Sequence, residues 1–278
     1  MNNRTDYTLV VASCDNYSDI WNPYFRLLKI NWPEFDKHII LICENKSFSF
    51  NGLDIEVVNI NDKYWSNRLI VALKKVKTKY VLFSLDDFFI NDKVDNEEIV
   101  FCLNELNKHK DIATFSFADS LVNDVDDGVY QNYDLRHLYG EYRFNTQAAL
   151  WRKKDLLKVL RKNESAWDAE NNGTFRARVL LKNKRFYSVK KTKKLAISYE
   201  FGGGLHHGAW TKDTPALFDK YNITGIDFSK RGFDEKPTEE YTKLRYNDYV
   251  IRKKTLKEKI IEYLVAKGIK LKKIRKKT

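Results

Sequence analysis

Residues 79–90 read KYVLFSLDDFFI, an almost unbroken apolar run that two adjacent carboxylates interrupt. The run 80–85 predicts a strand buried on both faces, which is typical of a parallel sheet. Ligands of open α/β sheets bind beyond the carboxyl ends of such strands, where Asp86 and Asp87 lie. Two adjacent like charges need a compensating cation or donor groups, and their hard oxygens suit Mg²⁺ or Mn²⁺. The alternative is a strand followed by a polar turn, because Asp-Asp pairs are common in turns.

Apolar strands alternate with amphipathic helices around this stretch. Strands are expected at 8–13, 38–43, 55–60, 80–85, 112–117, 146–151, 186–189 and 195–198. Helices are expected from about 19 to 33 and at 64–76, 97–109, 154–160, 175–181 and 246–271. Residues 118–145 and the glycine-rich 201–210 are expected to be loops. The alternation from 8 to 117 predicts an α/β fold with a mostly parallel central sheet and helices on both faces.

The positive charge of the chain is concentrated at its C-terminal end. The chain has 278 residues and a net charge of +12, and residues 245–278 hold 13 of its 50 Lys and Arg but 3 of its 38 Asp and Glu. The first 244 residues are therefore close to neutral. This distribution argues against a globally basic nucleic-acid binder, so no nucleic-acid partner is expected. We expect one large domain over 1–244, followed by a basic amphipathic helical tail over 245–278.

The three cysteines and the hydropathy pattern set the expected compartment. Cys14, Cys43 and Cys102 are widely spaced and form no CxxC, which fits free thiols in a reducing compartment. No basic region followed by an apolar run begins the sequence, and no window holds eighteen consecutive apolar residues. We therefore expect a cytoplasmic protein without a signal peptide or a membrane-spanning helix.

Several charged residues follow the expected elements in a recognisable order. Asp15 ends the first strand, Glu44 ends the second, and Arg68 lies on the next long helix. The carboxylate-rich segment Trp167-Asp168-Ala169-Glu170 is expected to form a turn before a helix that contains Arg176 and Arg178. With the Asp86–Asp87 pair, this order resembles the glycosyltransferases of the GT-A fold over residues 8–210, particularly the inverting family 2 type.

Four segments carry the resemblance. The Asp86–Asp87 pair looks like a shortened DxD motif, although it lacks the full triad of acids. Glu170 with residues 175–182 and 184–187 is similar to the "ED…R…G-hydrophobic" segment of the family. Residues 147–151 are similar to its acceptor-side strand, and residues 208–210 to a late Gly-x-Trp turn. The resemblance implies a GT-A-like α/β fold, with residues 1–117 as the nucleotide-sugar-binding half and 118–244 as the acceptor half.

The resemblance also implies site roles. Asp86 and Asp87 would hold a divalent metal, Mn²⁺ or Mg²⁺, and Glu170 would be the catalytic base, with Asp168 as its competitor. Sugar transfer requires these two functions, because the leaving diphosphate must be neutralised and the acceptor hydroxyl must lose a proton. The expected nucleotide-sugar contacts are Asp15, Glu44, Arg68, Asp86 and Asp87, and the expected acceptor contacts are Gln147, Trp167 and His207.

Each of these residues also has a purely structural interpretation. Glu170 could simply favour a helix N-terminus, Asp15 and Glu44 could be turn residues, and Arg68 could be a solvated helix residue. His206 and His207 are adjacent in a glycine-rich loop, so phosphate or product contact is favoured over metal ligation. The tyrosines of residues 119–144 could stack on a sugar acceptor or belong to an ordinary surface loop.

The predicted function is metal-dependent, inverting transfer of a sugar from a nucleotide sugar, with a UDP-sugar as first choice. The expected acceptor is a surface polysaccharide, such as capsule or lipopolysaccharide, or a lipid-linked glycan. The basic tail would bind an anionic surface on the inner face of the membrane, or else pack on the domain as a terminal helix. One rival is a nucleotidyltransferase, but residues 14–18 are not the expected phosphate loop. The other is a non-catalytic membrane- or nucleic-acid-binding protein driven by the tail.

Overall fold

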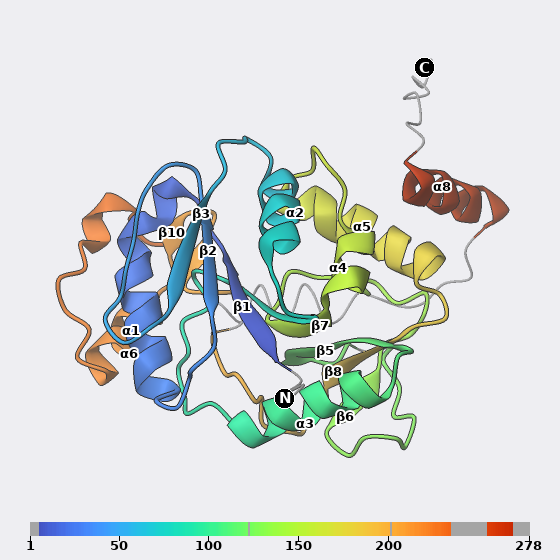
Figure 1. The fold of residues 1–278 in the computed structure, drawn as a ribbon, viewed down its shortest axis with the longest axis horizontal. Coiled ribbons are helices and arrows are strands. Elements are labelled where there is room, and N and C mark those ends of the chain that lie inside the picture. The colour runs from blue at the N-terminus through green and yellow to red at the C-terminus, as the bar shows by residue number, and fades with distance from the viewer. Residues whose placement is uncertain (1–5, 122, 201, 235–254, 269–278) are drawn as a thin grey trace.

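The computed structural model describes residues 6–121, 123–200, 202–234 and 255–268. In this part of the chain, a sheet of eight strands runs through the centre of the molecule with helices on both faces (Figure 1). The strand order is β3-β2-β1-β4-β7-β5-β8-β6. The strands are β1 Tyr7–Ala12, β2 Ile39–Cys43, β3 Ile55–Asn59, β4 Tyr80–Leu85, β5 Ile112–Asp119, β6 Tyr133–Leu135, β7 Ala149–Arg152 and β8 Arg185–Val189.

The central sheet is mostly parallel, which confirms the prediction. Strands β3, β2, β1 and β4 pair in parallel. Strand β7 is antiparallel to both β4 and β5, so β4 and β5 run in the same direction. Strand β8 is parallel to β5, and the short edge strand β6 is antiparallel to β8. The carboxyl ends of β1 and β4 therefore meet at one edge of the sheet.

Two apolar cores, one on each face of the sheet, hold the helices in place. Successive residues of β4 alternate between them: Tyr80 and Leu82 enter the core under α1 and α3, and Val81 and Phe83 enter the core under α2, α4 and α5. This alternation follows from the two-residue period of a strand. The helices are α1 Trp21–Asn31, α2 Trp65–Lys75, α3 Asn96–Lys108, α4 Lys153–Val159, α5 Ala166–Leu180, α6 Thr214–Lys220 and α8 Leu256–Lys267, with 3-10 turns η1 Asp15–Ile20 and η2 Phe228–Lys230.

Helix α5 begins earlier than the sequence pattern indicated. Trp167, Asp168 and Glu170 lie in its first turns and not in a turn that precedes it. The reason is a capping box: the Ser165 hydroxyl accepts the backbone N–H of Asp168, and the Asp168 carboxylate accepts the backbone N–H of Ser165. These contacts satisfy amides that the helix itself leaves unpaired.

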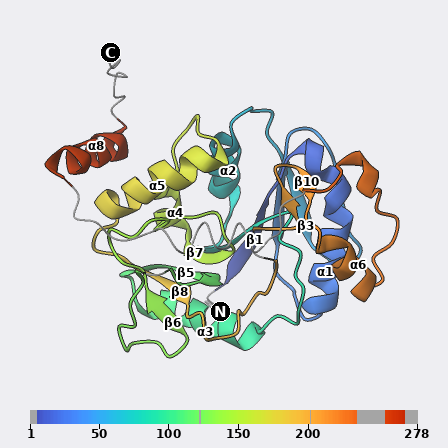
Figure 2. The same ribbon diagram turned by 180° about the vertical axis from the view of Figure 1, so that it is seen from behind.

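Other boundaries also differ from the prediction. Residues 195–198 form no strand, and the expected loop 201–210 contains the hairpin of β9 Leu205–His206 and β10 Ala209–Trp210. The turn of the hairpin has positive φ angles at His207 and Gly208. Of the expected tail helix 246–271, residues 256–267 are helical, and 246–254 and 269–271 lie outside the described residues. Both views show α8 beside α5 (Figure 2).

The thiol and membrane predictions concern the same described residues. The three cysteines are free, as predicted, with Cys43 and Cys102 buried and Cys14 partly exposed. In the described ranges, the helices are too short or too polar for a membrane span.

Candidate functional site

A cavity of about 340 Å³ opens at the carboxyl ends of β1 and β4. Its walls come from these two strand ends, the start of α2, the segment before β7, the first turns of α5 and the β9–β10 hairpin. Seven of the predicted site residues line it: Arg68, Asp86, Asp87, Gln147, Trp167, Glu170 and His207. The other three predicted residues, Asp15, Glu44 and Asp168, do not line it. The fold thus gathers side chains that are more than 130 residues apart in the sequence.

Asp86 and Asp87 form the most strongly perturbed part of the cavity. Their exposed fractions are 5% and 8%, and neither forms an ion pair with a described residue. Burial raises the pKa of Asp86 to about 7, although a hydrogen bond from the Ser13 hydroxyl acts in the opposite direction. Burial and the neighbouring charge of Asp86 raise the pKa of Asp87 well above its usual value. Two buried, unpaired carboxylates are costly when ionised, so this position favours a cation.

The donor set at this position fits a hard divalent cation. Carboxylate oxygens are the ligands that Mg²⁺ and Mn²⁺ prefer. No group of three or more His, Cys, Asp and Glu side chains in the described ranges is arranged to hold a metal. Asp86 and Asp87 would therefore be the residues that hold such a cation, together with water and substrate oxygens. Mg²⁺ sites in enzymes that bind phosphates are commonly built in this way.

Ser13 and Trp21 support the Asp86 carboxylate from below the cavity. The indole Nε1–H of Trp21 donates to the Ser13 hydroxyl oxygen at 2.6 Å, and that hydroxyl donates to Asp86. Both Ser13 and Trp21 are buried. Trp21 thus positions the Ser13 hydroxyl, and the Ser13 hydroxyl in turn fixes one oxygen of Asp86.

The glycines that directly precede the β9–β10 hairpin lie against Asp87. The backbone N–H of Gly204 donates to the Asp87 carbonyl oxygen at 2.7 Å. A Cβ on Gly203 would lie 2.2 Å from the Asp87 carboxylate. Gly203 also has a φ angle of +90°, which residues that carry a Cβ rarely adopt. Glycine is therefore required at 203 for two separate reasons, a close approach and a left-handed backbone.

Asp15 and Glu44 join the ends of β1 and β2 and hold Arg68. The Asp15 carboxylate accepts backbone N–H groups of Glu44 and Asn45 at 3.1 Å each and of Lys46 at 3.3 Å, while Glu44 accepts the Asp15 N–H at 2.6 Å. Burial alone would raise the pKa of Asp15, but these amides outweigh burial and lower it. The carboxylate oxygens of Asp15 and Glu44 are therefore largely occupied by hydrogen bonds within the protein.

Arg68 links Glu44 to the cavity, because it pairs with Glu44 and lines the cavity wall. Its Nη1 donates to the Glu44 carboxylate and to the Asp62 carbonyl oxygen, the latter at 3.0 Å. The residue is 9% exposed and lines the cavity, while its Nε is buried and has no hydrogen-bond partner among the described residues. A guanidinium held in this position at the cavity wall matches a phosphate or carbonyl oxygen of a ligand.

Glu170 is the carboxylate of α5 that lines the cavity. Its Oε1 accepts the backbone N–H of Thr146 at 2.8 Å and the Thr146 hydroxyl at 2.9 Å. Asp168, its competitor for the role of base, is turned to the capping box with Ser165. The geometry thus distinguishes the two acids, because only Glu170 shares the cavity with the Asp86–Asp87 pair.

Aromatic side chains from two elements line the cavity on the side of α5. The rings of Trp167 and His207 stack with centroids 6.3 Å apart and an interplanar angle of 26°. Trp167 is 58% exposed, which is unusual for so large an apolar side chain. Gln147 lies deeper, where its Oε1 accepts the Tyr199 hydroxyl at 3.0 Å. An exposed aromatic face with amides nearby is suited to binding a sugar ring.

Sequence reasoning missed several residues of the site. Ser13, Tyr17 and Asp234 line the cavity. His206, for which the sequence favoured phosphate or product contact, also lines it, and its Nδ1 contacts the Asp234 carboxylate. The Arg231 guanidinium lies 4.7 Å from the centre of the Tyr17 ring. Its positive charge acts to lower the pKa of Asp86, against the effect of burial. Only Ser13 and Tyr17 had a usable signal, since they flank the end of the first strand. Residues 231 and 234 come from a segment without any recognisable pattern.

Comparisons with known proteins give similarity at the level of solved structures. No family model and no curated protein matches the chain. The chain is similar to TarS 1-349 from S. aureus, with 15% identity, a TM-score of 0.45, and coverage of 68% of this chain and 59% of that chain. It is also similar to the mannosyltransferase PcManGT from Pyrobaculum calidifontis, with 11% identity, a TM-score of 0.45, and coverage of 66% and 55%.

A third similar structure is the bifunctional IspDF from Campylobacter jejuni, with 13% identity, a TM-score of 0.39, and coverage of 69% and 52%. The chain therefore spans less than two thirds of each of these three proteins. At these identities and TM-scores the similarity is one of overall α/β architecture and does not extend to substrate or chemistry.

Proposed function

We propose that the protein is a glycosyltransferase that moves a sugar from a nucleotide-sugar donor to a hydroxyl of a glycan acceptor. The observation that carries the proposal is the shared cavity of Asp86, Asp87 and Glu170. Two unpaired carboxylates at a strand end suit a cation that neutralises a leaving diphosphate. A separate carboxylate on another element suits removal of the acceptor proton.

A divalent cation at Asp86 and Asp87 would supply electrostatic stabilisation of the leaving diphosphate when bound. The buried position of the pair supports this role, since charge interactions are stronger where water is excluded. PcManGT was solved in complex with GDP-Man and Mn²⁺, and TarS 1-349 in complex with UDP-GlcNAc. We take a nucleoside diphosphate sugar as the donor, with a UDP-sugar as the first candidate.

The donor half of the cavity is assigned to residues 1–117. Arg68 lines the cavity and would offer its guanidinium to a phosphate or base oxygen of the nucleotide. Asp15 and Glu44 would act mainly by holding this guanidinium and joining β1 to β2. Their contribution to nucleoside binding is thus largely indirect.

The acceptor half is assigned to residues 118–244. Glu170 would accept the proton of the attacking hydroxyl, and direct displacement would invert the configuration at the transferred sugar. Trp167 and His207 would contact the acceptor ring, and Gln147 would offer its amide. The open aromatic rim supports a polysaccharide or lipid-linked glycan as the acceptor, because such chains extend beyond the cavity.

The proposal is tested by thermal unfolding of the full chain against nucleoside diphosphates and nucleotide sugars, each with and without Mn²⁺. A ligand at about 100 times its dissociation constant should stabilise the fold by about 2.7 kcal/mol. We expect one nucleoside class to raise the Tm, and Mn²⁺ to enlarge the shift. A folded sample that responds to none of the nucleotides would exclude the proposed donor site.

A further inference from the structure

Helix α8 packs on α5 with one of its faces. Glu262 and Ala266 on this face are 7% and 0% exposed. Arg178 of α5 donates from Nη1 to Glu262 Oε1 at 2.5 Å, and Arg161 Nη2 donates to the Ala266 carbonyl oxygen at 2.5 Å. A helix that accepts hydrogen bonds from two arginines of the domain in this way is part of the folded structure.

A different face of α8 exposes large apolar side chains. Leu256, Ile260 and Tyr263 are 75%, 49% and 51% exposed. Because each residue turns an α-helix by about 100°, positions i, i+4 and i+7 form one narrow stripe. This stripe lies roughly a quarter turn around the helix from Glu262 and Ala266, so packing on α5 leaves it uncovered.

Basic side chains surround the apolar stripe of α8. Lys257 and Lys259 lie on either side of the stripe and are exposed. Lys267 lies one turn beyond Tyr263 on the same face, with its ammonium 5.7 Å from the centre of the Tyr263 ring. The whole segment 245–278 holds 13 Lys and Arg against 3 Asp and Glu. An occupant of this face must therefore be apolar inside and anionic at its surface.

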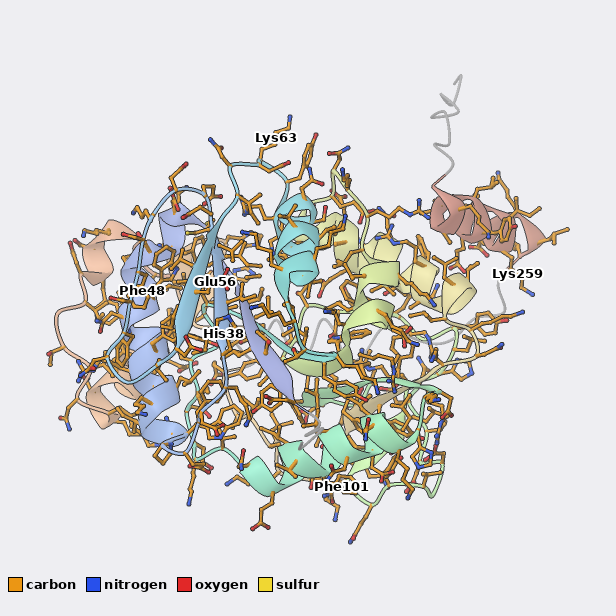
Figure 3. All side chains as sticks on the ribbon, in the orientation of Figure 1. His38, Phe48, Glu56, Lys63, Phe101 and Lys259 are labelled. Carbon is orange, nitrogen blue, oxygen red and sulfur yellow. The ribbon has the colours of Figure 1, made fainter. Side chains whose placement is uncertain are left out.

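A second exposed apolar pair, on α3, lacks the basic surround that α8 has. Val100 and Phe101 on α3 are 45% and 40% exposed, but the same helix carries Glu97, Glu98 and Glu105. Figure 3 shows Phe101 on α3, well away from Lys259 on α8. The α3 pair therefore serves as a matched control, apolar and exposed without the basic surround.

We propose that α8 docks the protein on an anionic membrane surface. The Leu256–Ile260–Tyr263 stripe enters the boundary between headgroups and acyl chains, and the flanking lysines contact lipid phosphates. The contact with Arg178 transmits this anchoring to α5, which carries Trp167 and Glu170, and the contact with Arg161 ties α8 to the segment before α5. The cavity is thereby held at the membrane, where a lipid-linked acceptor is presented. The docking itself is independent of the proposed glycosyl transfer and can be measured without it.

The test is co-sedimentation of the full chain with vesicles of phosphatidylglycerol and phosphatidylcholine, and with vesicles of phosphatidylcholine alone. Binding is expected only with the anionic vesicles, and it should weaken with salt because the lysine contribution is screened. The variant Leu256→Gln/Ile260→Gln/Tyr263→Gln should bind at least about tenfold more weakly, since it loses the apolar contribution. The α3 control Val100→Gln/Phe101→Gln should bind like the wild type.

Each variant is checked for an unchanged Tm, which the exposure of the substituted residues leads us to expect. No binding of the wild type to anionic vesicles would overturn the proposal, as would equal binding to both vesicle types. Equal loss in the α8 and α3 variants would also overturn it, because the binding surface would then not be α8. Loss of vesicle binding with intact nucleotide binding would separate this inference from the proposed function.

Discussion

Glu170 on α5 receives two hydrogen bonds from one residue, Thr146, and both end on the same carboxylate oxygen. The backbone N–H and the hydroxyl of Thr146 lie 2.8 and 2.9 Å from Oε1. Within the described residues, no hydrogen bond is made to Oε2. One oxygen is therefore held in place and the other is available in the cavity, which is the arrangement a positioned general base requires.

The Glu170→Gln variant should lose glycosyl transfer by about 10²–10⁴-fold, because an amide cannot take the acceptor proton. Donor binding should be retained, since the nucleotide contacts lie on other elements. Turnover and nucleotide affinity are measured separately. Asp168→Asn is the control: it weakens the capping box and should cost about 1 kcal/mol of stability with little effect on transfer. Transfer that survives Glu170→Gln and disappears in Asp168→Asn would reverse the assignment of the base.

The Asp87→Asn variant should be more stable than the wild type without metal at pH 8. It removes one of two adjacent buried charges, and a gain of 1 kcal/mol corresponds to about 2–4 °C in a domain of this size. The Mn²⁺-dependent part of the nucleotide shift should disappear in the same variant. Both changes are read from one set of thermal unfolding curves. Full Mn²⁺ dependence in Asp87→Asn would remove this residue from the metal site.

The stabilising effect of Mn²⁺ should increase with pH. Asp86 has its pKa raised to about 7, so the stability contributed by its neutral form is complete below the ordinary pKa and is lost as pH rises through 7. Protons and the cation compete for the same oxygens. The Mn²⁺-induced rise in Tm should therefore be larger at pH 8 than at pH 6. An equal rise at both values would place the cation elsewhere.

Gly203→Ala should abolish Mn²⁺-dependent nucleotide binding, while Gly202→Ala should not. Both glycines have φ +90°, so both substitutions carry the same backbone strain. The added methyl collides with the Asp87 carboxylate at 203, whereas no described residue beyond the chain neighbours lies within 4 Å of a Cβ at 202. Titration of each variant with Mn²⁺ and nucleotide separates strain from collision. Similar losses in both variants would mean that the hairpin backbone alone matters.

The Glu262→Gln variant should loosen α8 from α5. Arg178 is buried, and Glu262 and Glu141 are its acidic partners at 2.5 and 3.3 Å. Weakening the shorter pair leaves part of a buried charge unbalanced, at a cost of about 1–3 kcal/mol. Hydrogen exchange in α8 reports this local opening. Lys259→Gln on the exposed side of α8 is the matched control, and equally fast exchange in both variants would assign the change to the helix itself.

Short-range patterns in the sequence were enough to predict the elements that carry the site. The run 80–85 followed by two acids predicted a buried strand with carboxylates at its end, and the structure has β4 with Asp86 and Asp87 on the cavity. Seven of the ten predicted site residues share that cavity. The strand prediction is confirmed because strand burial is read within about ten residues, whereas the roles of the site residues stay predictions.

The tertiary structure decided what depends on contacts between distant segments. The placement of β7 between β4 and β5, and the hairpin that brings Gly203 against Asp87, join segments far apart in the chain. The hydrogen bonds of Asp15 to the end of β2 and the packing of α8 on α5 likewise join segments whose local patterns do not show that they meet. The sequence by itself thus determined which groups stand at the ends of strands and on helix faces. Which of them meet was decided by folding, because pairing and packing depend on the free energy of the whole chain.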